Sequence, residues 1–319
     1  MDPAKYTNLK FNAKPSKLFV ILLVNFFFTI ITLGLYYPWA KAKLLQYFYS
    51  ETEFHGSRFV FHGKGKEMFN AYIKVYGLFI VLLGSIKIFE LLGDPIMVII
   101  ATGVFYLIIL VLIPLAIHGL LRYRLSRTSW RGIHMGYRGS LSKLYKIYLI
   151  GILFTILTLG IYYAWMNVSI RKYVMANIRF GSLEFEFNGK GGILFLKYVF
   201  IVLSVLIPPV FLIYLSWFIV SIMNFKINNT VVKQDGELYL IQSTMKGGNY
   251  LWLKIVNFFI MVFTFGLGMP FVIIRNMKYE LSNMYFSNKI NMNAITQSEA
   301  DYKDATGEDL SDALDLNIF

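Results

Sequence analysis

The chain has 319 residues, of which 57% are hydrophobic and only 15% are charged. Soluble proteins usually carry about 25% charged residues, so this composition favours a membrane protein. The formal net charge is +13, and the cations lie in segments that flank apolar runs, which indicates anionic lipid head groups more readily than nucleic acid. The absence of cysteine excludes disulfides, thiolate chemistry and cysteine metal sites.

Long apolar runs follow a polar, basic N-terminal segment. They cover residues 18–40, 73–93, 95–121, 144–166, 194–223 and 251–274. The first of these runs carries no formal charge and is long enough to cross roughly 30 Å of hydrocarbon. The run at 194–223 contains Pro208-Pro209, so it is either one kinked helix or two short ones. Because a transmembrane β-barrel would alternate apolar and polar residues, these continuous runs predict an all-α polytopic membrane protein.

One motif divides the chain into repeats. Residues 32–39 read T-L-G-L-Y-Y-P-W, and the motif recurs at 158–165 and, in degenerate form, at 264–271. Alternating segments such as 59–61 precede a Gly turn and an apolar run, which is typical of short strands. The predicted unit is strand, Gly turn, membrane helix, aromatic break and basic helix. The predicted domains are a repeated transmembrane domain at 1–290, with units at about 9–55, 56–132, 133–181, 182–236 and 237–290, and an acidic soluble tail at 291–319.

The pattern T-L-G-[IL]-Y-Y-x-W followed by F-x-F-x-G-K-G, found at 32–39 and 59–65, resembles the YjgN-like family of bacterial inner-membrane proteins. This is a domain-of-unknown-function family, and the resemblance covers nearly the whole chain except the tail. It implies a multi-pass protein of the bacterial cytoplasmic (inner) membrane with no established activity. The chain departs from the pattern twice, because the third motif lacks both tyrosines and the run at 194–223 is short for two full spans.

The distribution of cations bears on topology. Six simple spans would divide lysines and arginines almost equally between the two sides, whereas the positive-inside rule predicts an asymmetry. Helical hairpins with cation-free tips would instead leave every basic segment and every strand on the cytoplasmic side, where the strands could pair into one sheet. A third arrangement treats the motif copies as inverted repeats, as in many transporters. We favour the hairpin arrangement.

Polar residues within the apolar runs are candidates for a solute path, because charges in a span are costly and are functional candidates by default. Lys87 and Glu90 share a helix face, although both lie close enough to the Asp94 turn to form a local ion pair. The amides of Asn25 and Asn257 favour a structural role, in hydrogen bonds between helices. The Thr–Gly pairs favour helix termination. The predicted path residues are Lys87, Glu90, Asn25, Asn257, Thr32, Thr158 and Thr264.

When the sequence is aligned with itself at an offset of 76 residues, three basic residues of one segment align with three basic residues of another. A position that is basic in both copies favours a cationic surface near lipid head groups. No two histidines are four residues apart and no carboxylate cluster accompanies them, so no metal site or other cofactor is expected. The predicted head-group residues are His55, Arg58, His62, Arg131, His134 and Arg138.

Function is the least legible property of the sequence. The sequence shows no nucleophile motif, paired catalytic carboxylates, dinucleotide fingerprint or P-loop, so an enzyme is the least supported class of protein. One hypothesis is a transporter or channel for a small solute, built from broken-helix units. The alternative is a non-transporting envelope protein that binds anionic lipid or a partner through a basic cytoplasmic face. The expected partners are the bilayer and anionic lipids, and nucleic acid is not expected.

Overall fold

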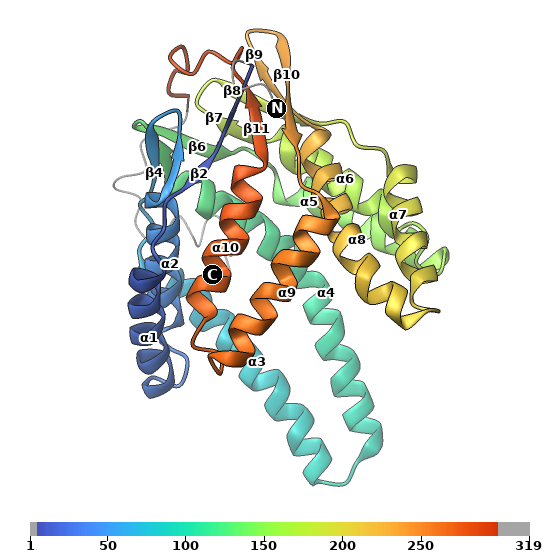
Figure 1. Ribbon diagram of the computed structural model, residues 1–319. Coiled ribbons are helices and arrows are strands. Elements are labelled where there is room, and N and C mark those ends of the chain that lie inside the picture. The colour runs from blue at the N-terminus through green and yellow to red at the C-terminus, as the bar shows by residue number, and fades with distance from the viewer. Residues whose placement is uncertain (1–4, 299–319) are drawn as a thin grey trace.

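The computed structural model describes residues 5–298, and within them the helices form antiparallel hairpins that extend to one side of the strands (Figure 1). The hairpins are α1 (Pro15–Ile31) with α2 (Tyr37–Ser50), α3 (Gly65–Leu91) with α4 (Pro95–Ser126), α5 (Leu141–Leu157) with α6 (Tyr163–Ala176), α7 (Gly191–Ser204) with α8 (Pro208–Asn228), and α9 (Gly247–Phe263) with α10 (Met269–Ser282). The predicted run at 194–223 is therefore two helices, which separate before Pro208.

The hairpin turns fall at the cation-free segments, and the three motif copies build the same turn. Thr158 shows the geometry: its hydroxyl donates to the Phe154 carbonyl at 2.6 Å and accepts the Tyr162 amide at 3.0 Å. Leu159 then takes a φ of 50° and Gly160 a φ of 94°, a left-handed pair that reverses the chain. Thr264 makes the equivalent bonds in the third copy. The loss of both tyrosines in that copy therefore leaves the turn unchanged.

The hairpins differ in the length of their helices. Within residues 5–298, α3, α4 and α8 are long and apolar enough to cross a membrane, whereas α1, α7 and α9 are shorter apolar helices. The turns expose their apolar residues: Leu33 is 83% exposed, Leu159 95% and Phe265 96%. Such exposure at the hairpin ends suits lipid as the surrounding solvent.

The short strands predicted between the helices are present, and they pair into one antiparallel sheet, as the hairpin arrangement allows, so the all-α class describes only the helical part of the chain. The strand order is β1-β11-β10-β9-β8-β7-β6-β5-β4-β3-β2. Two-residue turns join β3 to β4, β5 to β6, β7 to β8 and β9 to β10, and a helical hairpin connects each of these pairs to the next strand of the sheet. The strands are β1 (Tyr6–Asn8), β2 (Lys10–Phe11), β3 (Thr52–Phe54), β4 (Ser57–Phe61), β5 (Thr128–Trp130), β6 (Ile133–Tyr137), β7 (Ile178–Phe180), β8 (Leu183–Phe187), β9 (Thr230–Gln234), β10 (Glu237–Ser243) and β11 (Met284–Ser287).

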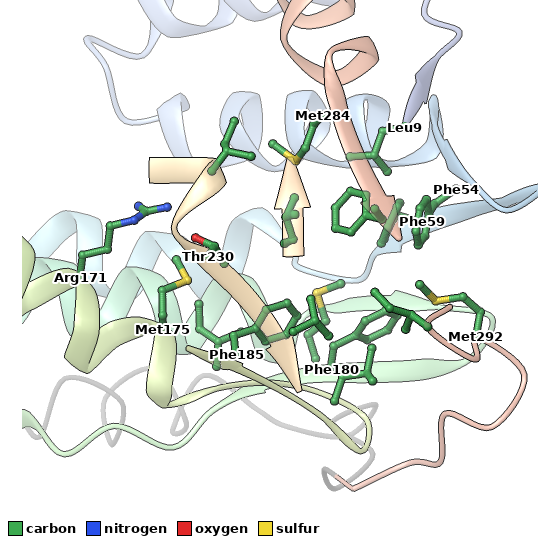
Figure 2. Close-up of a pocket in the computed structure, with 18 residues that line it drawn as sticks. Leu9, Phe54, Phe59, Arg171, Met175, Phe180, Phe185, Thr230, Met284 and Met292 are labelled. Carbon is green, nitrogen blue, oxygen red and sulfur yellow. The ribbon is translucent and has the colours of Figure 1, made fainter. Parts of the chain in front are cut away.

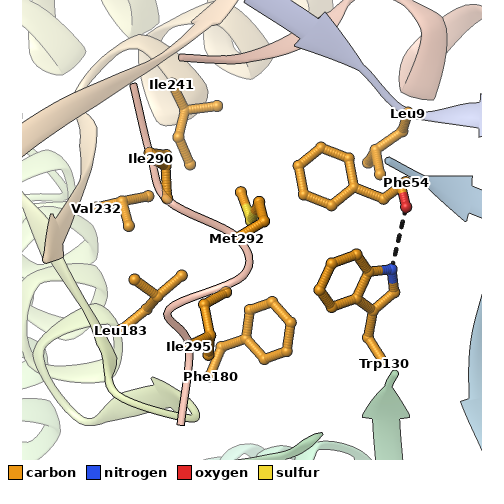
Figure 3. Packing of buried hydrophobic residues seen from close by; sticks show 10 residues of the cluster. All are labelled: Leu9, Phe54, Trp130, Phe180, Leu183, Val232, Ile241, Ile290, Met292 and Ile295. Carbon is orange, nitrogen blue, oxygen red and sulfur yellow. Dashed lines mark hydrogen bonds between the residues drawn. The ribbon is translucent and has the colours of Figure 1, made fainter. Parts of the chain in front are cut away.

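The sheet closes on itself. Only Leu9 separates β1 from β2, yet β1 pairs with β11 and β2 pairs with β3, which are the two ends of the remaining sheet. Side chains that alternate along each strand therefore point into one lumen. Trp130, fully buried, packs there with Phe54 and Phe180, and its Nε1 donates to the Phe54 carbonyl at 3.2 Å (Figure 3). We call this closed sheet the barrel.

Successive hairpins meet through a glycine at the start of a helix. Gly191, at the N-terminus of α7, lies so close to the indole of Trp165 on α6 that an added Cβ would sit 2.5 Å from its Cδ1. The same contact joins Gly65 to Trp39 and Gly247 to Trp217. These tryptophans therefore hold neighbouring hairpins together.

We expect Gly191→Ala to lower the free energy of unfolding by about 1–3 kcal/mol, because the methyl group would overlap the indole of Trp165. The neighbouring change Gly192→Ala is a matched control, since nothing lies within 4 Å of its added Cβ and alanine favours a helix by roughly 1 kcal/mol. Denaturant titration in detergent, followed by circular dichroism, measures both. Equal stability of the two variants would refute the proposed contact.

Candidate functional site

An apolar cavity of about 300 Å³ lies inside the barrel (Figure 2). Its volume falls at the low end of the roughly 300–1,000 Å³ found for small-molecule sites. The strands supply inward-facing aromatic, aliphatic and methionine side chains, such as Phe59, Met135 and Phe185. Methionine adapts to irregular ligands, and aromatic rings offer flat apolar contact. The cavity is chemically suited to a hydrocarbon chain.

One charged side chain reaches this cavity. Arg171, on α6, lies at one end of the lining, and Met292 lies at the opposite end (Figure 2). The guanidinium of Arg171 sits 5.1 Å from the ring centroid of Phe187 and donates from Nη2 to the Lys226 carbonyl at 3.4 Å. Its Nε is buried and has no hydrogen-bond partner. A half-buried cation with an unused donor can bind an anion.

A second cavity, of about 380 Å³, lies among α4, α6, α7 and α8. It shares Arg171, Met175 and Ile178 with the barrel cavity, so the two cavities have a common wall. Lys226 also lines this second cavity. Among the described residues that line the two cavities, none is Asp or Glu. The common wall is therefore cationic, and its surroundings are apolar.

Residues 290–298, which we call the C-terminal strap, close the barrel. Ile290, Met292 and Ile295 are at most 8% exposed and insert among the lumen side chains (Figure 3). Gln234 fixes the strap through two hydrogen bonds with the Asn291 backbone, of 2.9 and 3.0 Å. Apart from Ile290, the strap falls within the segment predicted as an acidic soluble tail, 291–319, and the remainder of that prediction, residues 299–319, lies outside the described residues.

The predicted head-group residues gather on one side of the barrel, along β3 to β6. Three of them contact the strap: Arg131 Nη1 donates to Asn293 Oδ1 at 3.1 Å, the His134 amide donates to Gln297 Oε1 at 2.8 Å, and Arg138 Nη2 donates to the Ser298 carbonyl at 3.2 Å. The structure thus gives these residues a role in positioning the strap, which their spacing in sequence does not reveal. Lipid binding by them stays a prediction.

The other three head-group candidates have partners nearby. His62 Nε2 lies 2.8 Å from Ser129 Oγ, and Arg58 lies 3.8 Å from a Glu51 carboxylate oxygen. His55 occupies the turn between β3 and β4. Burial, and then the nearby Arg131, lower the pKa of His55, so its ring is neutral at pH 7. Its side chain therefore adds no charge to the surface.

The predicted path residues are dispersed. Lys87 and Glu90 form an exposed ion pair of 2.8 Å near the end of the longest hairpin. Asn25 donates to the Ala40 carbonyl at 3.2 Å and Asn257 to Asn276 Oδ1 at 2.9 Å, each within its own hairpin. None of the seven residues lines either cavity described above. The arrangement does not bring them to a common path.

The residues predicted for a solute path and for head-group binding do not include Arg171. A shift of 126 residues, which superposes the first two motif copies, places Arg171 opposite Leu45. An arginine at the position where the first copy has leucine is the signal in the sequence that could have identified Arg171. Within residues 5–298 no group of three or more His, Asp or Glu side chains is placed to hold a metal ion.

Comparison with known proteins gives a family and a location. The chain is 34% identical over 135 residues to a protein of Salmonella typhimurium (strain LT2) called inner membrane protein YjgN, a match covering 42% of this chain and 32% of that protein. It is 30% identical over 132 residues to the proteins of the same name from Escherichia coli O157:H7 and Escherichia coli K12, with 41% of this chain and 31% of each relative covered. The matches thus span about a third of the length of these relatives.

No solved structure matches this chain. The inner-membrane relatives, together with the helices long enough to span, place the chain in the bacterial inner membrane. The sequence profile described as "Bacterial protein of unknown function (DUF898)" matches residues 6–241 and 198–313. The chain therefore belongs to the DUF898 family of bacterial proteins.

Proposed function

We propose that this protein binds a lipid-like molecule, with the hydrocarbon chain of the ligand held inside the barrel. The observation that carries the proposal is the apolar cavity of about 300 Å³ enclosed by strands and closed by the strap. The barrel is joined directly to helical hairpins whose exposed faces and turns are apolar. Bilayer lipid therefore surrounds the hairpins that carry the barrel.

The proposal places the barrel on the cytoplasmic side of the membrane. The strands and their basic flanking segments lie together at one end of the hairpins, and the opposite turns carry no Lys or Arg (Figure 1). The positive-inside rule assigns such a basic end to the cytoplasm. Anionic lipid head groups on that leaflet would attract it further.

Transport fits this structure less well than lipid binding. A solute path through the bilayer needs polar side chains that converge, usually where helices are broken. The Thr–Gly breaks instead end helices at apolar hairpin turns, and their hydroxyls are used in local hydrogen bonds. We therefore propose lipid binding as the function of the protein. The alternative from the sequence also involved lipid rather than transport, but it located the binding on a basic cytoplasmic face and not in the lumen.

Photolabelling tests the proposal on the full chain in phosphatidylcholine nanodiscs. The probe is a long-chain fatty alcohol with a diazirine at mid-chain, and mass spectrometry locates the adducts. We expect adducts on lumen residues such as Phe59, Met135 and Phe185, and we expect excess unlabelled oleyl alcohol to remove them. Adducts confined to the outer faces of the hairpins would overturn the proposal.

A pair of variants provides the control. Met135→Trp would fill the cavity from β6, so lumen labelling should fall several-fold. Val60→Trp adds the same side chain on the outer face of β4, which β5 separates from β6 in the sheet; Val60 is 48% exposed, and this change should leave labelling unchanged. Circular dichroism establishes that both variants fold. Equal labelling of the two folded variants would also contradict binding in the lumen.

A further inference from the structure

Arg171 is an exception in an otherwise regular repeat. The second helices of the hairpins end at the C-cap residues Glu51, Arg127, Asn177, Asn229 and Asn283. The residue six positions before each C-cap lies in the last two turns of its helix, near the barrel end of the hairpin. In chain order these residues are Leu45, Leu121, Arg171, Met223 and Met277. Four units thus carry leucine or methionine at a position where the third unit carries arginine.

The exception is costly in the free protein. Arg171 is half-buried and lacks a carboxylate partner, so the buried part of its guanidinium loses hydration that one long hydrogen bond and a ring contact replace only in part. Lys226 lines the second cavity together with Arg171, and it adds a positive charge there rather than a counter-charge. A charged residue that breaks the apolar pattern of a repeat, and that no other group of the protein neutralises, is typical of a functional position.

Resting on the binding function proposed above, we infer that the ligand is an anionic amphiphile with one acyl chain, whose carboxylate or phosphate binds Arg171, the cation that lines both cavities. The planar guanidinium matches either group in a bidentate manner. Arg171 lies at one end of the cavity lining, so a chain that begins there extends along the lumen toward Met292 (Figure 2). An anion in this position would satisfy the unused Nε of Arg171.

The same photolabelling assay tests the head group, with a diazirine fatty acid compared against the alcohol of equal chain length. At a pH where the acid is ionised, we expect half-maximal lumen labelling at a concentration at least about tenfold lower for the acid. Unlabelled oleate and lysophosphatidate should both compete better than lysophosphatidylcholine. Success of only one of these two anions would identify the head group as carboxylate or as phosphate.

Arg171→Met is the decisive variant, because methionine occupies the same position in the fourth and fifth units. It should fold, keep lumen labelling by the alcohol and lose the preference for the acid. Arg179→Met removes one positive charge from β7, where Arg179 pairs with Glu184, and should retain the preference. Binding of the ionised acid should raise the melting temperature of the wild type but not that of Arg171→Met.

Two failures remain distinguishable. Equal labelling of the wild-type lumen by acid and alcohol, or a preference that survives in Arg171→Met, would overturn the inference about the head group and leave lipid binding intact. Absence of lumen labelling by either probe would overturn both.

Discussion

Replacing Trp130 with alanine is expected to lower the free energy of unfolding by about 3–5 kcal/mol, the usual cost of removing a buried aromatic side chain. Trp130 is fully buried and contacts Phe54 and Phe180 across the lumen. Its Nε1 also donates to the Phe54 and Ser57 carbonyls, both at 3.2 Å, so the side chain joins β5 to the turn between β3 and β4. Its removal would leave a void in the wall of the barrel as well as unmade hydrogen bonds.

Denaturant titration followed by circular dichroism in the strand region measures this effect without relying on indole fluorescence. Trp130→Phe keeps an aromatic ring but loses the Nε1 bonds and part of the indole volume, so it should cost less than alanine. Val60→Ala, on the exposed outer face of the adjacent strand, should change stability by less than about 0.5 kcal/mol. A Trp130→Ala variant as stable as Val60→Ala would mean that the lumen is not a packed core.

The hairpins could be predicted from the sequence because their signals are local. An apolar run, a Thr–Gly pair and a change to basic residues all lie within one stretch of chain, and the structure places turns there. The strands were recognisable for the same reason, from alternation and the glycine that follows. Closure of the barrel was not predictable, because it depends on pairing of Tyr6–Asn8 with Met284–Ser287, segments from opposite ends of the sequence.

The strap and Arg171 escaped prediction for different physical reasons. Ile290, Met292 and Ile295 are isolated apolar residues in a polar segment, and composition alone cannot show that an extended chain will bury each of them. Arg171 looked like an ordinary cation of a basic helix. Its importance emerges only when the surrounding walls are known to be apolar and the equivalent positions of the other units are compared.

The buried charge at the base of the longest hairpin should dominate the stability of that hairpin. Glu67 Oε2, near the start of α3, accepts from Arg127 Nε at 3.2 Å and from the Tyr123 hydroxyl at 3.0 Å. The side chains of Arg127 and Glu67 are 6% and 15% exposed. We expect Glu67→Ala to cost about 3–5 kcal/mol, because it leaves a buried guanidinium without this carboxylate.

Glu184→Ala is the control, since Glu184 pairs with Arg179 at 3.4 Å while its own side chain is 45% exposed. An exposed pair of this kind contributes roughly 0.2–1 kcal/mol, because water screens the charges. Denaturant titration of the two variants in the same detergent should therefore separate them by at least about 2 kcal/mol. Equal losses would show that the Glu67–Arg127 pair is hydrated. The two long helices α3 and α4 would then depend on contacts along their length, and not on an ion pair at their base.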